Sequence, residues 1–240
     1  MTVTRVSVWS GPRNISTALM YSFRQRADTS VVDEPLYAHY LARSGLEHPG
    51  REDVLAALDT DGEAVVRDLI LGQAPTPVMF YKNMAHHLRG LDWSFLAGLS
   101  NVILTRDPTE MIPSLIEQIP EPDIEETGLP VQVELLDAVL DQGEDPIVID
   151  SRLLLEDPPS VLGELCRRLG IEFEESMLTW EAGAVPEDGT WAPHWYEAVH
   201  RSTGFAPYSP KDATVPDRLS GLLAQASPLF ERLTAYAIGR

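Results

Sequence analysis

The sequence is poor in positive charge. It has 18 lysines and arginines against 37 aspartates and glutamates, so its formal net charge at pH 7 is -19. Only two of the cations are lysines, Lys82 and Lys211. A chain this acidic repels nucleic acids and anionic membrane surfaces. The composition therefore excludes general polyanion binding, favours a small neutral or cationic partner, and confines any bound anion to a local cationic pocket.

Cysteine and long apolar runs are also scarce. Cys166 is the only cysteine, which excludes an intramolecular disulfide and a cysteine cluster for zinc or iron–sulfur. It lies at helical spacing among Val161, Leu165 and Leu169, which is typical of an inert core thiol. No apolar run approaches the ~20 residues that span a bilayer, and Met1 leads straight into a strand pattern. We therefore expect a cytoplasmic protein.

Short apolar runs alternate with longer amphipathic stretches along the chain. The predicted strands are Val3–Trp9, Ser30–Asp33, Val78–Tyr81, Val102–Thr105 and Ile147–Ile149. The predicted helices are Ser16–Gln25, Glu52–Ala57, Ala64–Leu71, Thr109–Ile119, Val131–Asp141, Ser160–Leu169 and Pro216–Ala237. This order is typical of βαβ units and predicts a three-layer α/β fold, with a mostly parallel central sheet flanked by helices. The length suits one domain over residues 1–240.

Two stretches interrupt this pattern. Pro120–Pro130 is acidic and proline-rich, which predicts an exposed loop. Residues 183–216 are irregular and aromatic, with Trp191, Trp195, Tyr196, Phe205 and Tyr208. A loop this long acts as a lid over a binding site or packs as a flap against the sheet edge.

The first motif follows the first predicted strand. It reads Ser10-Gly11-Pro12-Arg13-Asn14-Ile15-Ser16-Thr17 and leads into a predicted helix. Amides at a helix start are unpaired and carry a partial positive charge, so they bind anions, and Arg13 adds a cation. The loop lacks the lysine and second glycine of the G-x-x-x-x-G-K-[ST] pattern. It therefore predicts an anion site that differs from magnesium-nucleotide loops, or else a well-capped helix with a solvated Arg13.

The second motif begins where the fourth predicted strand ends, at Arg106. Asp107 can cap the next helix and Pro108 fits its first position. Ser114 lies eight residues after Arg106, nearly two helical turns on, and its side chain leans back toward the helix start. Pro113 is expected to kink this helix.

Together, the loop Ser10–Thr17 and the pair Arg106 and Ser114 resemble the signatures of the PAPS-dependent sulfotransferases, in particular a bacterial branch of this P-loop superfamily (PAPS is phosphoadenosine phosphosulfate). Ile147–Asp150, the acidic Ser151–Pro158 and the helix that follows look like the family's late strand, acidic loop and closing helix. The resemblance implies an enzyme that transfers a sulfuryl group from PAPS to a small-molecule hydroxyl or amine and releases PAP without a metal. It also implies that the loop binds the phosphosulfate, while Arg106 and Ser114 bind the ribose phosphate.

The same resemblance bears on the catalytic groups. Arg13 stands where the family has a lysine or arginine, and Lys82, after the third predicted strand, is expected to contact the phosphosulfate. The acceptor's proton needs a base. Glu34 is the favoured candidate, and Pro35 is expected to hold it in extended geometry. His86 is the alternative. One branch of the family has a catalytic histidine two positions after its lysine, but Met84 occupies that position here, and the first histidine after Lys82 is His86. Arg13, Glu34, Lys82 and Arg106 are expected to gather at the carboxyl edge of the sheet.

Two other functions fit part of the pattern. A P-loop kinase or nucleotide hydrolase shares the strand–loop–helix order but needs a loop lysine and a magnesium shell. A non-catalytic nucleotide-binding module would keep the fold without the chemistry. The remaining histidines, His39, His48, His194 and His200, show no metal-ligand spacing, so no metal site is expected. The amphipathic Pro216–Ala237 is expected to pack on the sheet or to form a homodimer contact.

Overall fold

The computed structural model describes residues 3–210 and 214–239, so Lys211 and two further residues of the irregular stretch lie outside the described residues. The chain divides into two compact units. Unit 1 draws on Met1–Val8, Ser16–Asn101 and Glu174–Phe205, and unit 2 on Trp9–Ile15, Val102–Phe173 and Ala206–Arg240. The single domain over residues 1–240 stays a prediction.

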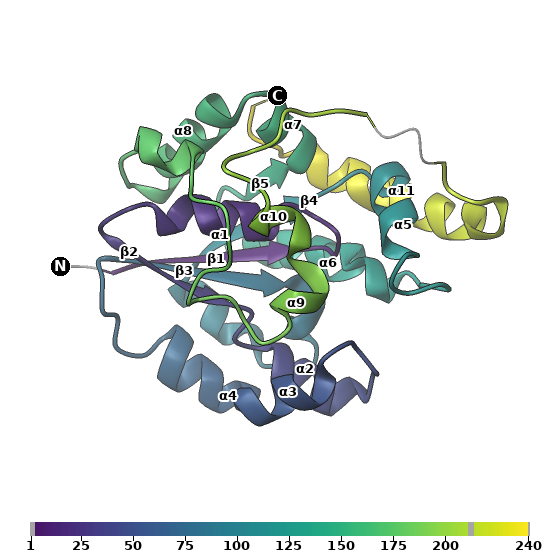
Figure 1. The fold of residues 1–240 in the computed structure, drawn as a ribbon, viewed down its shortest axis with the longest axis horizontal. Coiled ribbons are helices and arrows are strands. Elements are labelled where there is room, and N and C mark those ends of the chain that lie inside the picture. The colour runs from purple at the N-terminus through teal and green to yellow at the C-terminus, as the bar shows by residue number, and fades with distance from the viewer. Residues whose placement is uncertain (1–2, 211–213, 240) are drawn as a thin grey trace. The chain divides into compact units, whose positions relative to one another are not determined.

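All five predicted strands are present and belong to one sheet. They are β1 Thr4–Ser10, β2 Thr29–Asp33, β3 Val78–Met84, β4 Ser100–Thr105 and β5 Ile147–Asp150, in the order β2-β3-β1-β4-β5. Pairing is parallel, with Asp33 opposite Lys82 in the β2–β3 register and Thr105 opposite Asp150 in the β4–β5 register. The predicted α/β class, a parallel sheet flanked by helices, is confirmed (Figure 1).

Unit 1 carries its helices around β2 and β3. Its elements are α1 Ser16–Arg24, α2 Tyr37–Ser44, α3 Arg51–Ala57, α4 Gly62–Val65, η1 Val66–Ile70, η2 Ala85–Leu88, η3 Trp93–Gly98, η5 Glu175–Leu178, α9 Ala192–Trp195 and α10 Glu197–His200. Helix α1 packs on β2 and β3, where Phe23 stacks on Phe80 with ring centroids 4.4 Å apart. Trp191 and Tyr196 join Tyr37 and Leu41 in a second apolar cluster. The aromatic stretch is therefore anchored in the core of unit 1.

Unit 2 contains the rest of the helices. They are α5 Pro108–Leu115, η4 Glu125–Thr127, α6 Leu129–Asp141, α7 Ser151–Glu156, α8 Pro158–Leu169, η6 Asp217–Leu219 and α11 Ser220–Thr234. Helix α11 packs against α5 and α6. Cys166 is fully buried on the apolar face of α8, as its spacing predicts.

Several local predictions were wrong. Ser151–Pro158 is not a loop, because the Asp150 side chain accepts a hydrogen bond from the Arg152 amide and starts α7. Ala64–Leu71 is not a single α-helix, since α4 gives way to a π-helical turn over Val66–Ile70. The stretch 183–216 is not wholly irregular, because it contains α9 and α10. Helix α5 passes through Pro113 and ends at Leu115, short of the predicted Ile119.

Candidate functional site

The loop after β1 lies in unit 2 up to Ile15, and Ser16 begins α1 in unit 1. Ser10 and Gly11 are buried, whereas Pro12, Arg13, Asn14 and Ile15 are half-buried. A Cβ on Gly11 would come within 2.9 Å of the Thr127 carbonyl oxygen, so this position has no room for a larger residue. The side-chain amide of Asn14 donates to the Leu104 carbonyl over 3.0 Å, which ties the loop to β4. Of the last two loop residues, Ser16 is buried and Thr17 is half-buried.

Arg13 is the centre of a small polar group. Its Nε donates to Ser114 Oγ over 2.9 Å, and its carbonyl accepts a hydrogen bond from Arg106 Nη1 over 2.5 Å. Arg106 also pairs with Glu110 over 3.3 Å. The structure thus brings Arg106 and Ser114 to Arg13, which precedes them by 93 and 101 residues in sequence.

The backbone of Arg13 is unusual, with φ of 51°. This left-handed conformation is uncommon for a residue other than glycine and costs about 1–3 kcal/mol, so it persists only where its surroundings impose it. Among the described residues, the terminal amino groups of Arg13 make no hydrogen bond. A cation with free donors on a strained loop is suited to holding an anion.

Gln132 of α6 forms hydrogen bonds to the strands β1 and β4 next to this loop. It is fully buried, and its Nε2 donates to the carbonyl oxygens of Trp9 over 3.0 Å and Leu104 over 2.8 Å. These carbonyls sit near the carboxyl ends of β1 and β4. A buried amide that bridges two strands holds the base of the loop in place. The sequence offered no local signal for this residue.

Unit 1 contains a buried charged cluster at the carboxyl ends of β2 and β3. Lys82 is 1% exposed, and its Nζ donates to Asp33 over 2.9 Å, to Tyr196 over 2.6 Å and to Glu34. An ammonium group has three N–H donors, and all three are used. Lys82 is therefore not the surface lysine that its residue type suggests, and its contact with a phosphosulfate stays a prediction.

The charges in this cluster shift the proton affinities of its members. Burial raises the pKa of Glu34 and the neighbouring charge of Asp33 adds to this, although Lys82 acts in the opposite direction. Burial disfavours the charged Lys82, but Asp33 and Glu34 outweigh it and raise the Lys82 pKa. Lys82 is accordingly an ammonium ion, and Glu34 is a carboxyl group that holds its proton to higher pH than an ordinary glutamate.

Glu34 does not have the extended geometry that Pro35 was expected to impose. Its φ is 40°, in the left-handed region. The Glu34 amide donates to the Lys82 carbonyl over 2.7 Å, and the Tyr37 amide donates to the Glu34 carbonyl over 3.0 Å. These bonds start the turn into α2 and override the local preference of a residue before proline. The two unusual φ angles of the described non-glycine residues thus fall on two predicted site residues, Arg13 and Glu34.

His86 and His87 follow β3 in the short helix η2. Burial lowers the pKa of His86 to about 3 and moves the pKa of His87 in the same direction. Within the described part of the chain, Nδ1 of His86 and both ring nitrogens of His87 have no hydrogen-bond partner. Such a low pKa makes His86 a poor base near neutral pH. The environment therefore favours Glu34 over His86 as the candidate base.

The buried histidines give a first prediction, for stability against pH. Their folded-state pKa lies below the unfolded value of about 6.5, so the stability tied to their neutral form is lost as pH falls below that value. We expect His87→Leu to reduce the loss of unfolding free energy between pH 7 and pH 5 by about 2 kcal/mol. Urea unfolding at both pH values measures this. His194→Leu, at an exposed position, is the control, and an equal pH dependence in wild type and His87→Leu would contradict the prediction.

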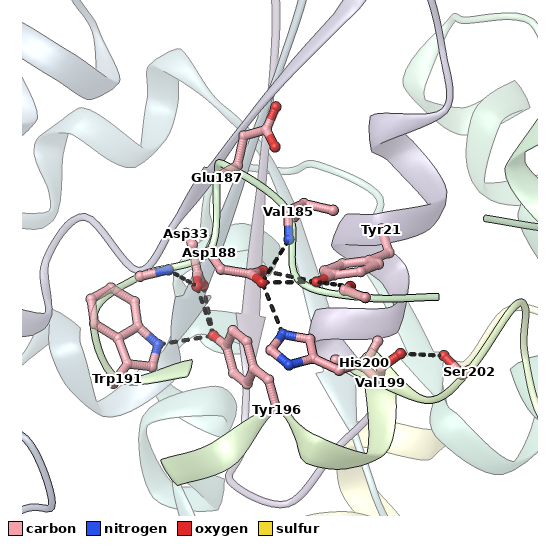
Figure 2. A network of polar contacts seen from close by, with 12 residues as sticks. Tyr21, Asp33, Val185, Glu187, Asp188, Trp191, Tyr196, Val199, His200 and Ser202 are labelled. Atoms are coloured by element: carbon pink, nitrogen blue, oxygen red, sulfur yellow. Dashed lines mark hydrogen bonds and ion pairs between the residues drawn. The ribbon is translucent and has the colours of Figure 1, made fainter. Parts of the chain in front are cut away.

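Sequence reasoning missed three residues of the buried cluster in unit 1. Asp33 had one signal, its place beside Glu34 at a strand end. Tyr196 and Trp191 had none beyond their aromatic character. Figure 2 shows how Trp191, Tyr196 and Asp33 are linked, with Trp191 Nε1 donating to the Tyr196 hydroxyl over 2.9 Å.

No group of three or more histidine, cysteine, aspartate or glutamate side chains is placed to hold a metal ion in residues 3–210 and 214–239. None of the described helices combines the length and apolarity required of a membrane span.

Comparisons with known proteins point in one direction. The sequence matches the sulfotransferase domain family, Sulfotransfer_5, over residues 4–237. Among solved structures, the sulfotransferase domain from the curacin biosynthetic pathway superposes with a TM-score of 0.54 at 18% identity, covering 97% of this chain and 96% of that one. The sulfotransferase domain of the Synechococcus PCC 7002 olefin synthase gives 0.56 at 16% identity, covering 96% and 95% of the two chains. At such identities the likeness shows a shared fold.

Two curated plant proteins are similar in sequence. They are branched-chain-amino-acid aminotransferase-like proteins 1 and 2 of Arabidopsis thaliana, which are 41% and 40% identical over 95% and 96% of this chain. This chain spans 41% of the length of each of them.

Proposed function

The chain belongs to the sulfotransferase domain family, and we propose that it transfers a sulfuryl group from PAPS to the hydroxyl or amine of a small acceptor. The observation that carries the proposal is the convergence of Arg106 and Ser114 on Arg13, in the loop that follows β1. Two guanidinium groups and a hydroxyl are the donors that phosphate and sulfate groups need. In an otherwise strongly acidic chain, such a group is well suited to an anionic donor.

In this proposal the loop Ser10–Thr17, Arg106 and Ser114 hold the donor. The terminal amino groups of Arg13 bind the phosphosulfate together with the loop amides and the hydroxyls of Ser16 and Thr17. Arg106 and Ser114 bind the ribose phosphate. Gly11 lets the loop pack closely against the Thr127 carbonyl, because a Cβ there would clash with that oxygen.

Glu34 is the proposed base. The acceptor's oxygen or nitrogen forms a bond to sulfur while the bond between sulfur and the phosphate oxygen of PAPS breaks. The acceptor's proton passes to the Glu34 carboxylate, and PAP leaves with the electrons of the broken bond. The raised pKa of Glu34 supports this role, because a base is most effective when its pKa approaches the working pH. Arg13 counters the charge that develops on the leaving oxygen.

The names of the plant relatives do not favour an aminotransferase function for this chain. A pyridoxal-dependent transaminase needs a lysine that forms a Schiff base, and Lys82 is the lysine of the described residues. Its Nζ is occupied by Asp33, Glu34 and Tyr196, and its pKa is raised, so it lacks the neutral amine required for that chemistry.

The acceptor in this proposal is small and neutral or cationic, because the net charge of -19 opposes anionic partners. The same charge argues against nucleic acids and anionic membranes as partners. A cytoplasmic location and a homodimer contact through α11 complete the proposal.

Calorimetry with PAP in the presence of a chelator tests donor binding. We expect saturable binding that the chelator does not change, because the proposed ligands are protein groups. 5′-AMP lacks the ribose 3′-phosphate of PAP and is expected to bind at least roughly tenfold more weakly, since it loses charge-assisted hydrogen bonds. No binding of PAP, or binding that the chelator removes, would overturn the proposal. Binding without PAPS-dependent product from a panel of alcohols and amines would point to the non-catalytic module.

A further inference from the structure

The two carboxylates of the buried cluster are bonded unequally. Asp33 accepts hydrogen bonds from Lys82 Nζ over 2.9 Å, from the Tyr196 hydroxyl over 2.7 Å and from the Gly189 amide over 3.1 Å. The Glu34 carboxylate accepts a hydrogen bond from Lys82 Nζ, and Glu34 Oε2 is 4.0 Å from His87 Nε2. Donors stabilise the ionised form of a carboxyl group. Asp33 is therefore the carboxylate on which donors from β3, Tyr196 and the Gly189 backbone converge, whereas Glu34 shares the Lys82 donor with it.

The direction of the Tyr196 hydroxyl is decided by its neighbours. It lies within hydrogen-bond distance of Lys82 Nζ, Trp191 Nε1 and the Asp33 carboxylate. An ammonium and an indole N–H can only donate, so they occupy the two lone pairs of the phenol oxygen. The single O–H must then point at Asp33. Tyr196 is 5% exposed, and burial raises its pKa well above the usual value, so the hydroxyl keeps its proton.

Another carboxylate, that of Asp188, holds the segment that carries Tyr196. Asp188 accepts hydrogen bonds from the Tyr21 hydroxyl over 2.9 Å, from His200 Nε2 over 2.9 Å and from the Val185 amide over 3.0 Å. Figure 2 shows this network beside the one around Asp33. The amide of the next residue, Gly189, is the one that donates to Asp33. The segment is thus fixed on both sides of Tyr196, by Asp188 and by His200 of α10.

We propose that Tyr196 is a positioning residue, whose hydroxyl locks Asp33 and Lys82 together so that Glu34 is the carboxylate left to accept a proton. The three N–H groups of Lys82 donate to Asp33, Glu34 and Tyr196, and the single O–H of Tyr196 donates to Asp33. Through Tyr196, the segment 183–205 therefore contributes to catalysis, because it controls which groups form hydrogen bonds to Asp33 at the end of β2 and to Glu34 after it. This inference rests on the proposed role of Glu34 as the base.

A double-mutant cycle tests it. Tyr196→Phe keeps the ring and removes the hydroxyl, and we expect kcat to fall roughly tenfold, the cost of one charge-assisted hydrogen bond, with little change in the Kd of PAP. In a Glu34→Gln background the same change is expected to cost less than about twofold, because Tyr196 acts through Glu34. Tyr81→Phe is the matched control, since Tyr81 is equally buried and its hydroxyl donates to the Ile70 carbonyl over 2.9 Å.

Equal losses in both backgrounds would reduce Tyr196 to a structural residue and overturn the inference. A second measurement does not depend on activity: carbon NMR of the two carboxyl groups between about pH 4 and pH 8. The pH range of proton uptake at Glu34 is expected to differ between the wild type and Tyr196→Phe. An unchanged pattern in the variant would contradict the inference. A wild type that makes no PAPS-dependent product, with the expected NMR pattern, would instead refute the proposed function.

Discussion

Replacement of Glu34 by glutamine is expected to lower kcat by about 10²–10⁴-fold, the contribution typical of a general base. The amide has nearly the same shape and can still accept a hydrogen bond from Lys82, but it cannot take a proton. The Kd of PAP should change little, because donor binding is assigned to other residues. Steady-state kinetics with PAPS, together with calorimetry on the same variant, separate the two effects.

His86→Gln is the control that distinguishes the two candidate bases. Because burial lowers the pKa of His86 to about 3, we expect this variant to lose far less activity than Glu34→Gln. The pH profile gives an independent check. Glu34 must be ionised to act, so kcat/KM should rise with pH, with its midpoint above the range of an ordinary glutamate because the pKa is raised. A loss confined to His86→Gln would reverse the assignment.

Replacement of Arg106 by alanine is expected to weaken PAP binding by at least about 30-fold. Removal of one partner of a charged hydrogen-bonded pair costs about 2–5 kcal/mol. Arg106 also holds the Arg13 carbonyl through Nη1, so its loss frees the strained turn at Arg13 as well as removing a cation. Calorimetry with PAP measures the change, and thermal unfolding checks that the variant is folded.

Arg167→Ala is a suitable control, because Arg167 lies in the same unit, its side chain is 70% exposed, and it forms an ion pair with Glu164 of its own helix. It removes the same charge and is expected to leave PAP binding unchanged. Arg106→Lys should bind PAP more weakly than wild type, since lysine lacks the planar fork of donors that suits a phosphate. If Arg106→Ala binds PAP as tightly as Arg167→Ala does, the assignment of Arg106 to the donor is wrong.

Much of the fold could be predicted from local patterns. The five strands followed from short β-branched runs, and most helices followed from amphipathic spacing and caps, as at Asp107 and Pro108. Short helices escaped prediction where a few residues form one or two turns, as in α7, α9 and α10. Tertiary contacts rather than intrinsic propensity stabilise helices of this length. The same limit explains the π-helical turn at Val66–Ile70.

The sequence by itself determined the loop after β1 and the Arg106–Ser114 pair, because each depends on a strand that ends in a turn and a helix that begins there. The tertiary structure alone decided how the charges combine. Asp33, Lys82 and Tyr196 are far apart in sequence, yet the β2–β3 register and the anchored segment around Asp188 place them within hydrogen-bond distance. Burial then raises the pKa of Glu34, and three hydrogen bonds use all the N–H donors of Lys82. Desolvation and long-range pairing depend on which groups become neighbours, and no local pattern encodes that.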